Sequence, residues 1–433
     1  MSAPSSAPAR PPGLSSRLSG AQALPLVPAT VLVGIVIAWA ASGGGYESLP
    51  ALDAGYGPGP WYLGALALTG LLWVTAAGLG SIRLSRWSAI ACSALAGYIA
   101  WSFLSMLWAK DQALAFLGSD RALVYFASFT TFALLAWRNW SARLMLGLLA
   151  AGISVLAIVV AVKVATLADP GSLYIRQRLA WPLGYYNANA ALFTMGAVVA
   201  IALAAQRCTP AALRVAASVG AAVCLQLAVL GQSRGWLFTA PLVLLAALLL
   251  VPGRLRLLAA TLPPALATAV IAPALLRVYS RSTPGGNALA QPHLSRVLHQ
   301  QGSHAVKAML IADVVLAVAS AALVALDRRL RLGDAQRRRI DRVAAVGAVA
   351  LVLAGIGADL AAVKGDPVAR AERAWHSFAD AGSKAEATSS HFGTLASNRA
   401  DIWRVALDEF AHHPFTGIGQ DNFATSYTRL RRR

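Results

Sequence analysis

The stretch 305–342, AVKAMLIADVVLAVASAALVALDRRLRLGDAQRRRIDR, joins an apolar run to a cluster of positive charge. Residues 305–326 are nearly all apolar and are long enough to cross a bilayer, which takes about 20 residues. Seven arginines follow between Arg328 and Arg342. Short loops rich in Lys and Arg stay on the cytoplasmic side of a membrane. This stretch therefore predicts a transmembrane helix that ends in the cytoplasm.

The rest of the chain has the composition of a multi-pass membrane protein. Of its 433 residues, 57% are hydrophobic and 13% are charged, and this charged share is about half that of an average globular domain. Backbone polar groups inside a bilayer must be paired internally, so the apolar runs should be helices. A net charge of +19 would suit nucleic acid. Arginines in cytoplasmic loops explain it better, and we predict no nucleic-acid partner.

We predict an all-α, polytopic integral membrane protein in three parts. Residues 1–22 are rich in Pro, Ser and Ala and predict a disordered cytoplasmic tail. Residues 23–364 form the transmembrane domain, and residues 365–433 form an extracytoplasmic segment with an amphipathic helix near the C-terminus. The hydropathy predicts about eleven transmembrane helices, at 24–42, 61–79, 88–108, 121–137, 144–165, 188–206, 211–230, 235–251, 257–276, 305–326 and 343–363.

The loop charges orient these helices. Arginines mark alternate loops, for example at Arg10, Arg83, Arg138, Arg207 and Arg254, and again in the cluster quoted above. The N-terminus is therefore predicted to lie in the cytoplasm. The alternation places outside the loop 172–189, the turn 231–236, the loop 277–304 and the tail after residue 364.

Arginines on the predicted outer side need an explanation other than topology, and Arg234 is one of them. It stands at the start of the span 235–251. A helix N-terminus presents free N–H groups and the positive end of a dipole. Gly231 and Gly235 would allow a ligand to approach closely. Arg234 is therefore either part of a phosphate-binding site or an interfacial anchor that sets the depth of the helix in the bilayer.

The segment 397–423, SNRADIWRVALDEFAHHPFTGIGQDNF, predicts an amphipathic helix in the outer tail. Asn398 can cap it, and Pro414 limits its far end. Arg399 falls within the apolar stripe, one turn before Trp403. A cation on a docking face needs an anion beside it, unless its stem packs and its head reaches water. The opposite, polar face carries Asp401, Arg404 and Asp408.

Aromatic and amide residues follow two further outer arginines, Arg176 and Arg178. The rings suit the aromatic belt of a membrane interface and also suit stacking on sugar rings. The amides can cap the next helix and can also bond hydroxyl groups. Together, this chemistry suits an anionic, sugar-bearing ligand, because arginine forks match phosphate oxygens. The side chains concerned are Trp181, Tyr185, Tyr186, Asn187 and Asn189.

The chain lacks the motifs of several enzyme classes. There is no P-loop, no dinucleotide fingerprint, no HExxH and no DxD pair. We predict no cofactor and no metal. Asp313, the one acid well inside a span, either pairs with Lys307 or acts as a base. The outer histidines are too irregularly spaced to favour a metal site; they are His293, His299 and His304.

Three stretches together resemble the O-antigen ligase and polymerase superfamily of membrane glycosyltransferases. In NRADIWRVALDEFAHHPFTGIGQDNF (398–423), an Arg is followed by a Trp, a His-Pro pair and Gly-x-Gly before an aromatic. LGYYNANAALFTMG (183–196) resembles the family's Gly- and Asn-rich entry to a mid-chain span. QSRGWLFTAPLVLL (232–245) resembles its Ser-Arg-Gly start of the next-but-one span. The resemblance extends over roughly residues 25–430.

The resemblance implies metal-independent glycosyl transfer on the outer face of the cytoplasmic (inner) membrane of a bacterium. The donor would be a glycan on a polyprenyl pyrophosphate, and the acceptor a glycan, a lipid or a protein. Arg234 and Arg399 match the family's motif arginines, which implies that they hold the pyrophosphate as catalytic residues. The protein would mainly orient the substrates and stabilise charge. The substrate-binding residues implied are Arg176, Arg178, Tyr186, Asn187, Asn189 and Trp403.

The chain departs from the family at its end, TSYTRLRRR (425–433). The family usually continues with more outer loop, a functional His and further spans, and His412 and His413 belong to the His-Pro signature instead. We therefore expect a fragment of a longer reading frame; the alternatives are a second subunit that completes the site, or a chain without this activity. Two other functions stay open, a transporter or flippase of lipid-linked glycan and a non-catalytic membrane scaffold.

Overall fold

The computed structural model describes residues 26–42, 60–79, 84–135, 137–175, 177–250, 253–281, 292–329 and 399–431, with single residues between 333 and 350. The elements are α2 (Val27–Ala41), α3 (Pro60–Gly78), α4 (Arg86–Leu104), η4 (Ser105–Leu107), α5 (Gln112–Leu134), α6 (Asn139–Thr166), η5 (Pro170–Leu173), β1 (Tyr174–Ile175), β2 (Arg178–Leu179), α7 (Tyr186–Ala204), α8 (Ala211–Leu230), α9 (Arg234–Leu250), α10 (Arg254–Arg281), α11 (Pro292–Arg329), α14 (Arg399–His412) and α15 (Phe423–Leu430).

The helices follow the hydropathy of the sequence. Each predicted span from 24–42 to 305–326 is occupied by a helix, from α2 to α11 in the same order. Among the described residues, six helices are long and apolar enough to cross a bilayer, namely α4 with η4, α6, α7, α8, α10 and α11. The structure is thus mostly helical with several membrane-spanning candidates. The total of about eleven spans stays a prediction, because most of the last predicted span, 343–363, lies outside the described residues. The predicted tail, 1–22, also lies outside them.

One predicted outer loop, 277–304, is largely helical. Helices α10 and α11 extend into it from both sides. The first turns of α11 are held by polar contacts with the loop after α6, where His299 Nδ1 lies 2.7 Å from Leu167 O. A helix satisfies its own backbone groups and can therefore continue beyond the apolar run into a polar environment. For this reason, the length of the apolar run alone underestimated the lengths of both helices.

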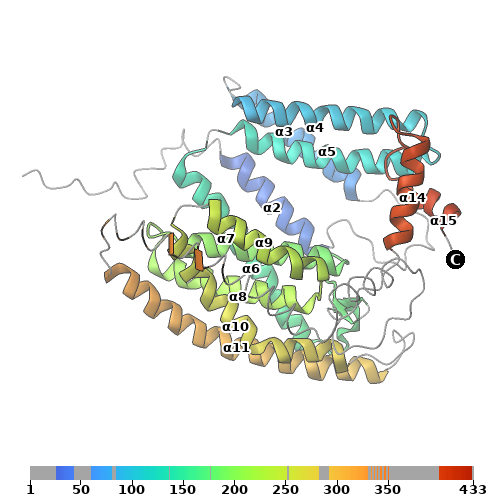
Figure 1. The fold of residues 1–433 in the computed structure, drawn as a ribbon. Coiled ribbons are helices and arrows are strands. Elements are labelled where there is room, and N and C mark those ends of the chain that lie inside the picture. The colour runs from blue at the N-terminus through green and yellow to red at the C-terminus, as the bar shows by residue number, and fades with distance from the viewer. Residues whose placement is uncertain are drawn as a thin grey trace, which may run out of the picture.

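The helices pack in two groups, which Figure 1 shows one above the other. Helices α3, α4 and α5 lie side by side, and buried residues of α2, α3 and α5 form a small core. A larger core lies among α6, α7, α8, α10 and α11. Helix α2 contacts both α5 and α6 and so connects the two groups.

Small residues let α7 and α8 approach α6 closely. A Cβ added at Gly196 of α7 would lie 2.5 Å from the Ile153 side chain. A Cβ at Gly220 of α8 would lie 2.5 Å from the Oγ of Ser154. Helices in lipid associate through close packing and interhelical hydrogen bonds, because apolar side chains gain little by leaving apolar lipid. These glycines are therefore part of what holds the larger group together.

Polar pairs also join the antiparallel helices α8 and α11 along their length. Asp313, expected either to pair with Lys307 or to act as a base, accepts a hydrogen bond from Gln226. Such bonds between membrane helices stabilise their association by about 1 kcal/mol each. The pairs are Gln226 with Asp313, Ser218 with Ser320 and Arg214 with Asp327, each with 2.9 Å between the bonded atoms.

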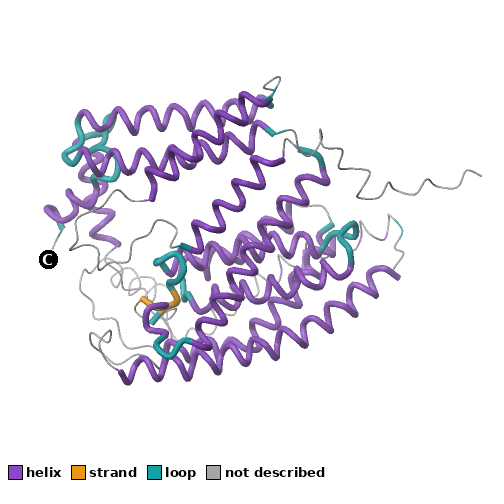
Figure 2. Tube along the Cα trace, turned by 180° about the vertical axis from the view of Figure 1, so that it is seen from behind, coloured by secondary structure: helices purple, strands orange, loops and turns teal. Residues whose placement is uncertain are grey.

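The loops predicted inside and outside lie at opposite ends of the larger helix group. Asp327, near the end of α11, lies close to Arg207, Arg214 and Arg256, which come from predicted cytoplasmic loops or helix ends. The first turns of α11 contact the predicted outer loop after α6. The two short strands and the C-terminal segment lie at one end, at the left in Figure 2. The two sets of loops are thus kept apart, while their sides of the membrane stay a prediction.

Candidate functional site

A short β-hairpin lies between α6 and α7, in the stretch predicted to face outward. β1 and β2 pair antiparallel, with Tyr174 opposite Leu179 and Ile175 opposite Arg178. The hairpin directs Arg178 back toward the start of α7, where it packs on a tyrosine ring. Arg176, which lies between the two strands in the sequence, is outside the described residues.

Asp169 fastens the start of this hairpin to α11. Its Oδ1 accepts hydrogen bonds from Ser295 Oγ at 2.7 Å and from the backbone N–H of Gly171 at 3.0 Å. These bonds, that from Ser295 first, lower the pKa of the Asp169 carboxyl below its ordinary value. The stability that Asp169 contributes is therefore present above its unfolded pKa of about 3.9. It is lost as the pH falls through the lower folded pKa.

Asn189 holds the loop that follows the hairpin. Its side chain is fully buried. Its Nδ2 donates to the carbonyl oxygens of Trp181 at 2.6 Å and Leu179 at 3.4 Å, and its Oδ1 accepts from the N–H of Leu183 at 3.2 Å. All three of these hydrogen bonds join the Asn189 amide to backbone groups of the loop. Asn189 therefore positions the loop after the hairpin rather than presenting its amide outward.

Arg178 and Tyr186, both expected to bind substrate, are brought into contact. Arg178 is only 5% exposed, and its guanidinium carbon lies 3.3 Å from the centroid of the Tyr186 ring. Tyr186 is the first residue of α7, and the Tyr185 ring lies beside it. The Tyr185 hydroxyl accepts a hydrogen bond from Asn187 Nδ2 at 2.5 Å. Cation–π contact with the ring fixes the guanidinium at the N-terminus of a helix.

The turn before α9 packs directly on the start of α7. A Cβ at Gly231 would lie 3.1 Å from the carbonyl oxygen of Tyr186. Trp236 Nε1 donates a 2.5 Å hydrogen bond to Thr194 Oγ1, which joins the first turns of α9 to α7. Arg234 is the first residue of α9, although its side chain lies outside the described part. We call Arg178, Tyr186, Asn187, Asn189 and the N-terminus of α9 the hairpin site.

Helix α14 begins at Arg399, and it packs through its polar face. Asp401 is buried, and Arg404 Nη2 donates both to Asp401 Oδ1 at 2.9 Å and to the carbonyl oxygen of Leu430 in α15 at 2.6 Å. The side chain of Arg399 lies outside the described part. An exposed apolar stripe suits a helix that lies in a membrane interface. This stripe comprises Ile402, Trp403, Leu407 and Phe410, which are 38%, 62%, 64% and 63% exposed.

The helical wheel placed Trp403 and Arg399 on the apolar face, which the family resemblance implied would cover the donor. Trp403 and the other residues of the apolar stripe are exposed, so the docking of this face stays a prediction. In the described structure, the polar face meets α15 because the Asp401–Arg404 pair and the carbonyl of Leu430 satisfy one another. The i,i+3 pairing of Asp401 with Arg404 is as predicted.

The C-terminal signature fastens this segment to the turn between α4 and α5. Asn422 is buried; its Oδ1 accepts from the N–H of Asp111 at 2.7 Å, and its Nδ2 donates to the carbonyl oxygen of Asp111 at 2.9 Å. Gly419 has φ +97°, and a Cβ there would lie 2.5 Å from the Cβ of Ala109. Only glycine fits such a backbone at such a distance. We call residues 419–422 the C-terminal clasp.

Two further contacts complete the clasp. Asp421 accepts bonds of 2.7 and 2.6 Å from Arg121 Nη2 of α5. The N–H of Gln420 donates to Ser105 Oγ at 3.0 Å. From the sequence, Gly-x-Gly served only as a family signature, and no role was predicted for these side chains. The polar run Gln-Asp-Asn directly after the second glycine could have indicated a hydrogen-bonded contact here.

A cavity of about 320 Å³ lies between the clasp and α14. It is bounded by the α4–α5 turn on one side and by α14 and α15 on the other. Its walls carry side chains of both charges, so it suits a polar group better than an apolar one. The ionisable residues among its walls are Lys110, Glu409, His413 and Arg429.

The expected site residues thus fall into two clusters. Arg178, Tyr186, Asn187 and Asn189 lie together at the hairpin site, whereas Trp403 belongs to α14. The clasp residues described above join that C-terminal segment to α4, η4 and α5. Across the described ranges, no group of three or more His, Cys, Asp and Glu side chains could hold a metal ion.

Comparison with known proteins adds one finding. A family model described as O-antigen ligase matches residues 302–432. The matched residues take in most of α11, all of α14, the clasp and α15. No curated protein and no solved structure matches the chain.

Proposed function

Membership of the O-antigen ligase superfamily, which that match supports, is the premise from which we propose that the chain is a membrane glycosyltransferase. It transfers or polymerises glycan from a polyprenyl-pyrophosphate-linked donor on the outer face of the bacterial cytoplasmic membrane. The acceptor is a glycan, a lipid or a protein. The reaction needs neither a metal nor a cofactor.

The observation that carries this proposal is the convergence at the hairpin site. A buried arginine, Arg178, stacks on Tyr186 at the start of α7, and the turn before Arg234 packs on the same helix start. The N-termini of α7 and α9 and the Arg178 side chain therefore lie close together. Helix N-termini and guanidinium forks are the protein groups best suited to phosphate oxygens.

The proposed reaction requires these residues mainly to balance the charge of the leaving group. The bond between the sugar anomeric carbon and the pyrophosphate oxygen breaks, an acceptor hydroxyl oxygen bonds to that carbon, and the hydroxyl proton passes to the departing pyrophosphate. The pyrophosphate leaves readily once its negative charge is balanced, so preorganised cations accelerate the step. Arg234 and Arg399 are assigned to the pyrophosphate, and Arg178 is assigned to assist them; its contact with the Tyr186 ring supports this by fixing its guanidinium.

The remaining residues orient the substrates. Asn187 and Tyr186 line the start of α7 and bind the glycan, together with Arg176. Asn189 keeps the loop in place. The exposed Trp403 on α14 contacts the lipid-linked donor at the membrane interface. Holding donor and acceptor in register is itself a large part of catalysis.

Glycan transfer in proteoliposomes tests this function. The purified chain is supplied with a polyprenyl-pyrophosphate oligosaccharide and an acceptor, and turnover is measured with and without EDTA. Arg234→Gln should lower turnover about 10²- to 10³-fold, as loss of one charge-stabilising donor does. Arg234→Lys should recover only part of it, because an ammonium lacks the bidentate fork. EDTA should leave turnover unchanged.

Arg86→Gln is the matched control, because Arg86 starts α4 on the predicted cytoplasmic side. It should retain wild-type turnover. Normal turnover of a correctly folded Arg234→Gln variant would contradict the proposal and favour a membrane scaffold. Loss of glycan movement across the bilayer in Asp313→Asn, with no transfer by the wild type, would favour a transporter.

A further inference from the structure

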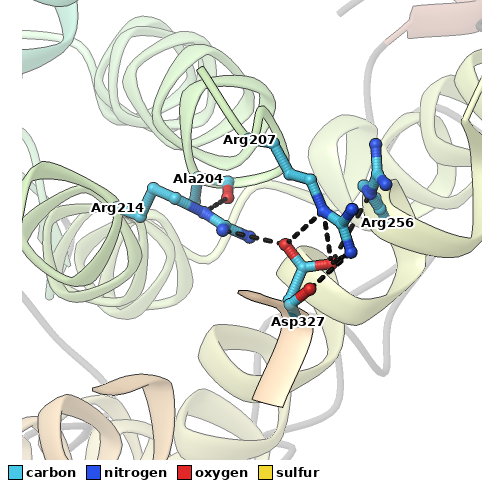
Figure 3. Close-up of polar contacts among 5 residues, drawn as sticks. All are labelled: Ala204, Arg207, Arg214, Arg256 and Asp327. Atoms are coloured by element: carbon cyan, nitrogen blue, oxygen red, sulfur yellow. Dashed lines mark hydrogen bonds and ion pairs between the residues drawn. The ribbon is translucent and has the colours of Figure 1, made fainter. Parts of the chain in front are cut away.

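A second charged cluster lies at the end of α11 that is remote from the hairpin site. Figure 3 shows its side chains, which gather around Asp327. In the last turns of α11, Asp327 contacts three arginines. Arg214 Nη1 lies 2.9 Å from Oδ2, Arg207 Nη2 lies 3.1 Å from Oδ1, and Arg256 Nε lies 3.6 Å from Oδ1. Arg207 follows α7, Arg214 belongs to α8 and Arg256 to α10. One carboxylate therefore joins four helix ends.

Positive charge exceeds negative charge in this cluster. Three guanidinium groups face one carboxylate, which leaves an excess of two positive charges among these side chains. Arg214 is buried and also donates to the carbonyl oxygen of Ala204 at 2.7 Å, so its role is structural. The Arg207 and Arg256 side chains are each 34% exposed. Cations held this close together favour a bound anion.

An apolar cavity of about 310 Å³ opens beside these arginines. The cluster forms one end of it, and the rest of its wall comes mainly from α10 and α11. A cationic rim joined to an apolar channel matches the two halves of a phospholipid. The apolar residues that matter are Ala259, Ala260, Pro263, Leu323, Val324 and Leu326.

We propose that this cavity binds an anionic phospholipid. The phosphate lies on Arg207 and Arg256, and part of an acyl chain lies along α10 and α11. Arginines at the ends of membrane helices lie at the depth of the headgroups, and their forks match phosphate oxygens. Basic pockets between membrane helices on the cytoplasmic side bind acidic headgroups in this way. The inference does not depend on the proposed glycosyl transfer.

Native mass spectrometry of the full chain in mild detergent tests the site. The probes are phosphatidylglycerol, which is anionic, and phosphatidylethanolamine, which is zwitterionic, at equal concentration. The wild type should retain phosphatidylglycerol preferentially. Arg256→Gln should weaken this retention about fivefold, the usual effect of one basic residue at a lipid surface. Adding Arg207→Gln should weaken it further, and Arg86→Gln should leave it unchanged.

A second set of measurements distinguishes a bound lipid from a free anion as the ligand. Ala259→Trp fills the apolar part of the cavity, and it should weaken phosphatidylglycerol retention while leaving the arginine cluster intact. Inorganic phosphate should not displace the lipid. Equal retention of the two lipids, or unchanged retention in Arg256→Gln, would overturn the proposal. So would displacement by phosphate with no effect of Ala259→Trp, because the site would then take a free anion. Melting temperatures show that each variant is folded.

Discussion

At the scale of single residues, the hairpin site depends on side chains that hold other groups in place. Arg178 lies against the Tyr186 ring, so the direction of its guanidinium is set before any ligand arrives. Asn189 pairs with backbone groups on either side of Trp181 and so defines the path of the loop. Preorganisation of this kind matters because a charge already in position costs no rearrangement during the reaction.

Asn189→Ala should destabilise the protein by about 1–3 kcal/mol, because buried carbonyl groups would lose their donor. Thermal unfolding in detergent measures the effect. Asn187→Ala is the control, since Asn187 is only partly buried and bonds a tyrosine hydroxyl. Its melting temperature should change much less. Equal melting temperatures for the two variants would show that Asn189 does not hold the loop.

At the scale of elements, α14 shows how a helix can pack through its polar face. Its apolar stripe is exposed, while Asp401 and Glu409 are buried. The segment owes its position to the clasp, which bonds the backbone of the α4–α5 turn through Asn422. An exposed apolar stripe is unfavourable in water but favourable at a bilayer surface. The helix is therefore suited to lie where a lipid-linked donor would present its pyrophosphate.

Asn422→Ala should release the C-terminal segment more than Asp421→Asn does. Asn422 is buried, and its loss removes the acceptor of the Asp111 N–H and one of the donors to the Asp111 carbonyl oxygen, at a cost of about 1–3 kcal/mol. The Arg121–Asp421 side chains are 35% and 32% exposed, so water screens this pair and it contributes roughly 1 kcal/mol or less. Hydrogen exchange of the α14 and α15 amides measures the release. Identical exchange in both variants and the wild type would contradict the clasp.

At the scale of the whole molecule, the two ends of the helix group differ in their chemistry. The two hairpin strands and the C-terminal segment lie toward one end, at the left in Figure 2. The arginines around Asp327, drawn in Figure 3, lie at the far end of α11. Helix α11 runs between these ends, and its polar pairs with α8 keep the two helices in register. Substrate and lipid would thus bind on opposite sides of one membrane domain.

Thiol labelling in intact cells tests this orientation. A membrane-impermeant maleimide should label Thr416→Cys, beside the clasp, and should not label Gly333→Cys until the membrane is opened. Both are made with Cys208→Ser, because Cys208 is exposed, whereas Cys92 and Cys224 are buried. The reverse pattern of labelling would show that the N-terminus is outside and that the proposed active face is cytoplasmic.

Much of the architecture was predictable because hydropathy is a local property. Helices α2 to α11 occupy the predicted spans, and the arginine pattern grouped the loops into the two sets that the structure keeps apart. The hairpin site was predicted less completely. The sequence indicated Arg178 and Tyr186 as candidates, but their stacking and the anchoring role of Asn189 depend on a loop whose path hydropathy does not describe.

The sequence by itself determined where the helices lie, which loops fall at the same end of the helix group and which arginines were unusual. A bilayer imposes these features on each segment separately, through apolar length and loop charge. Only the tertiary structure decided that α14 packs through its polar face, that Asp421 meets Arg121 and that Asp327 meets three arginines. Asp421 and Arg121 are 300 positions apart. Such contacts depend on which distant segments become neighbours, and no local pattern of charge or hydropathy specifies that choice.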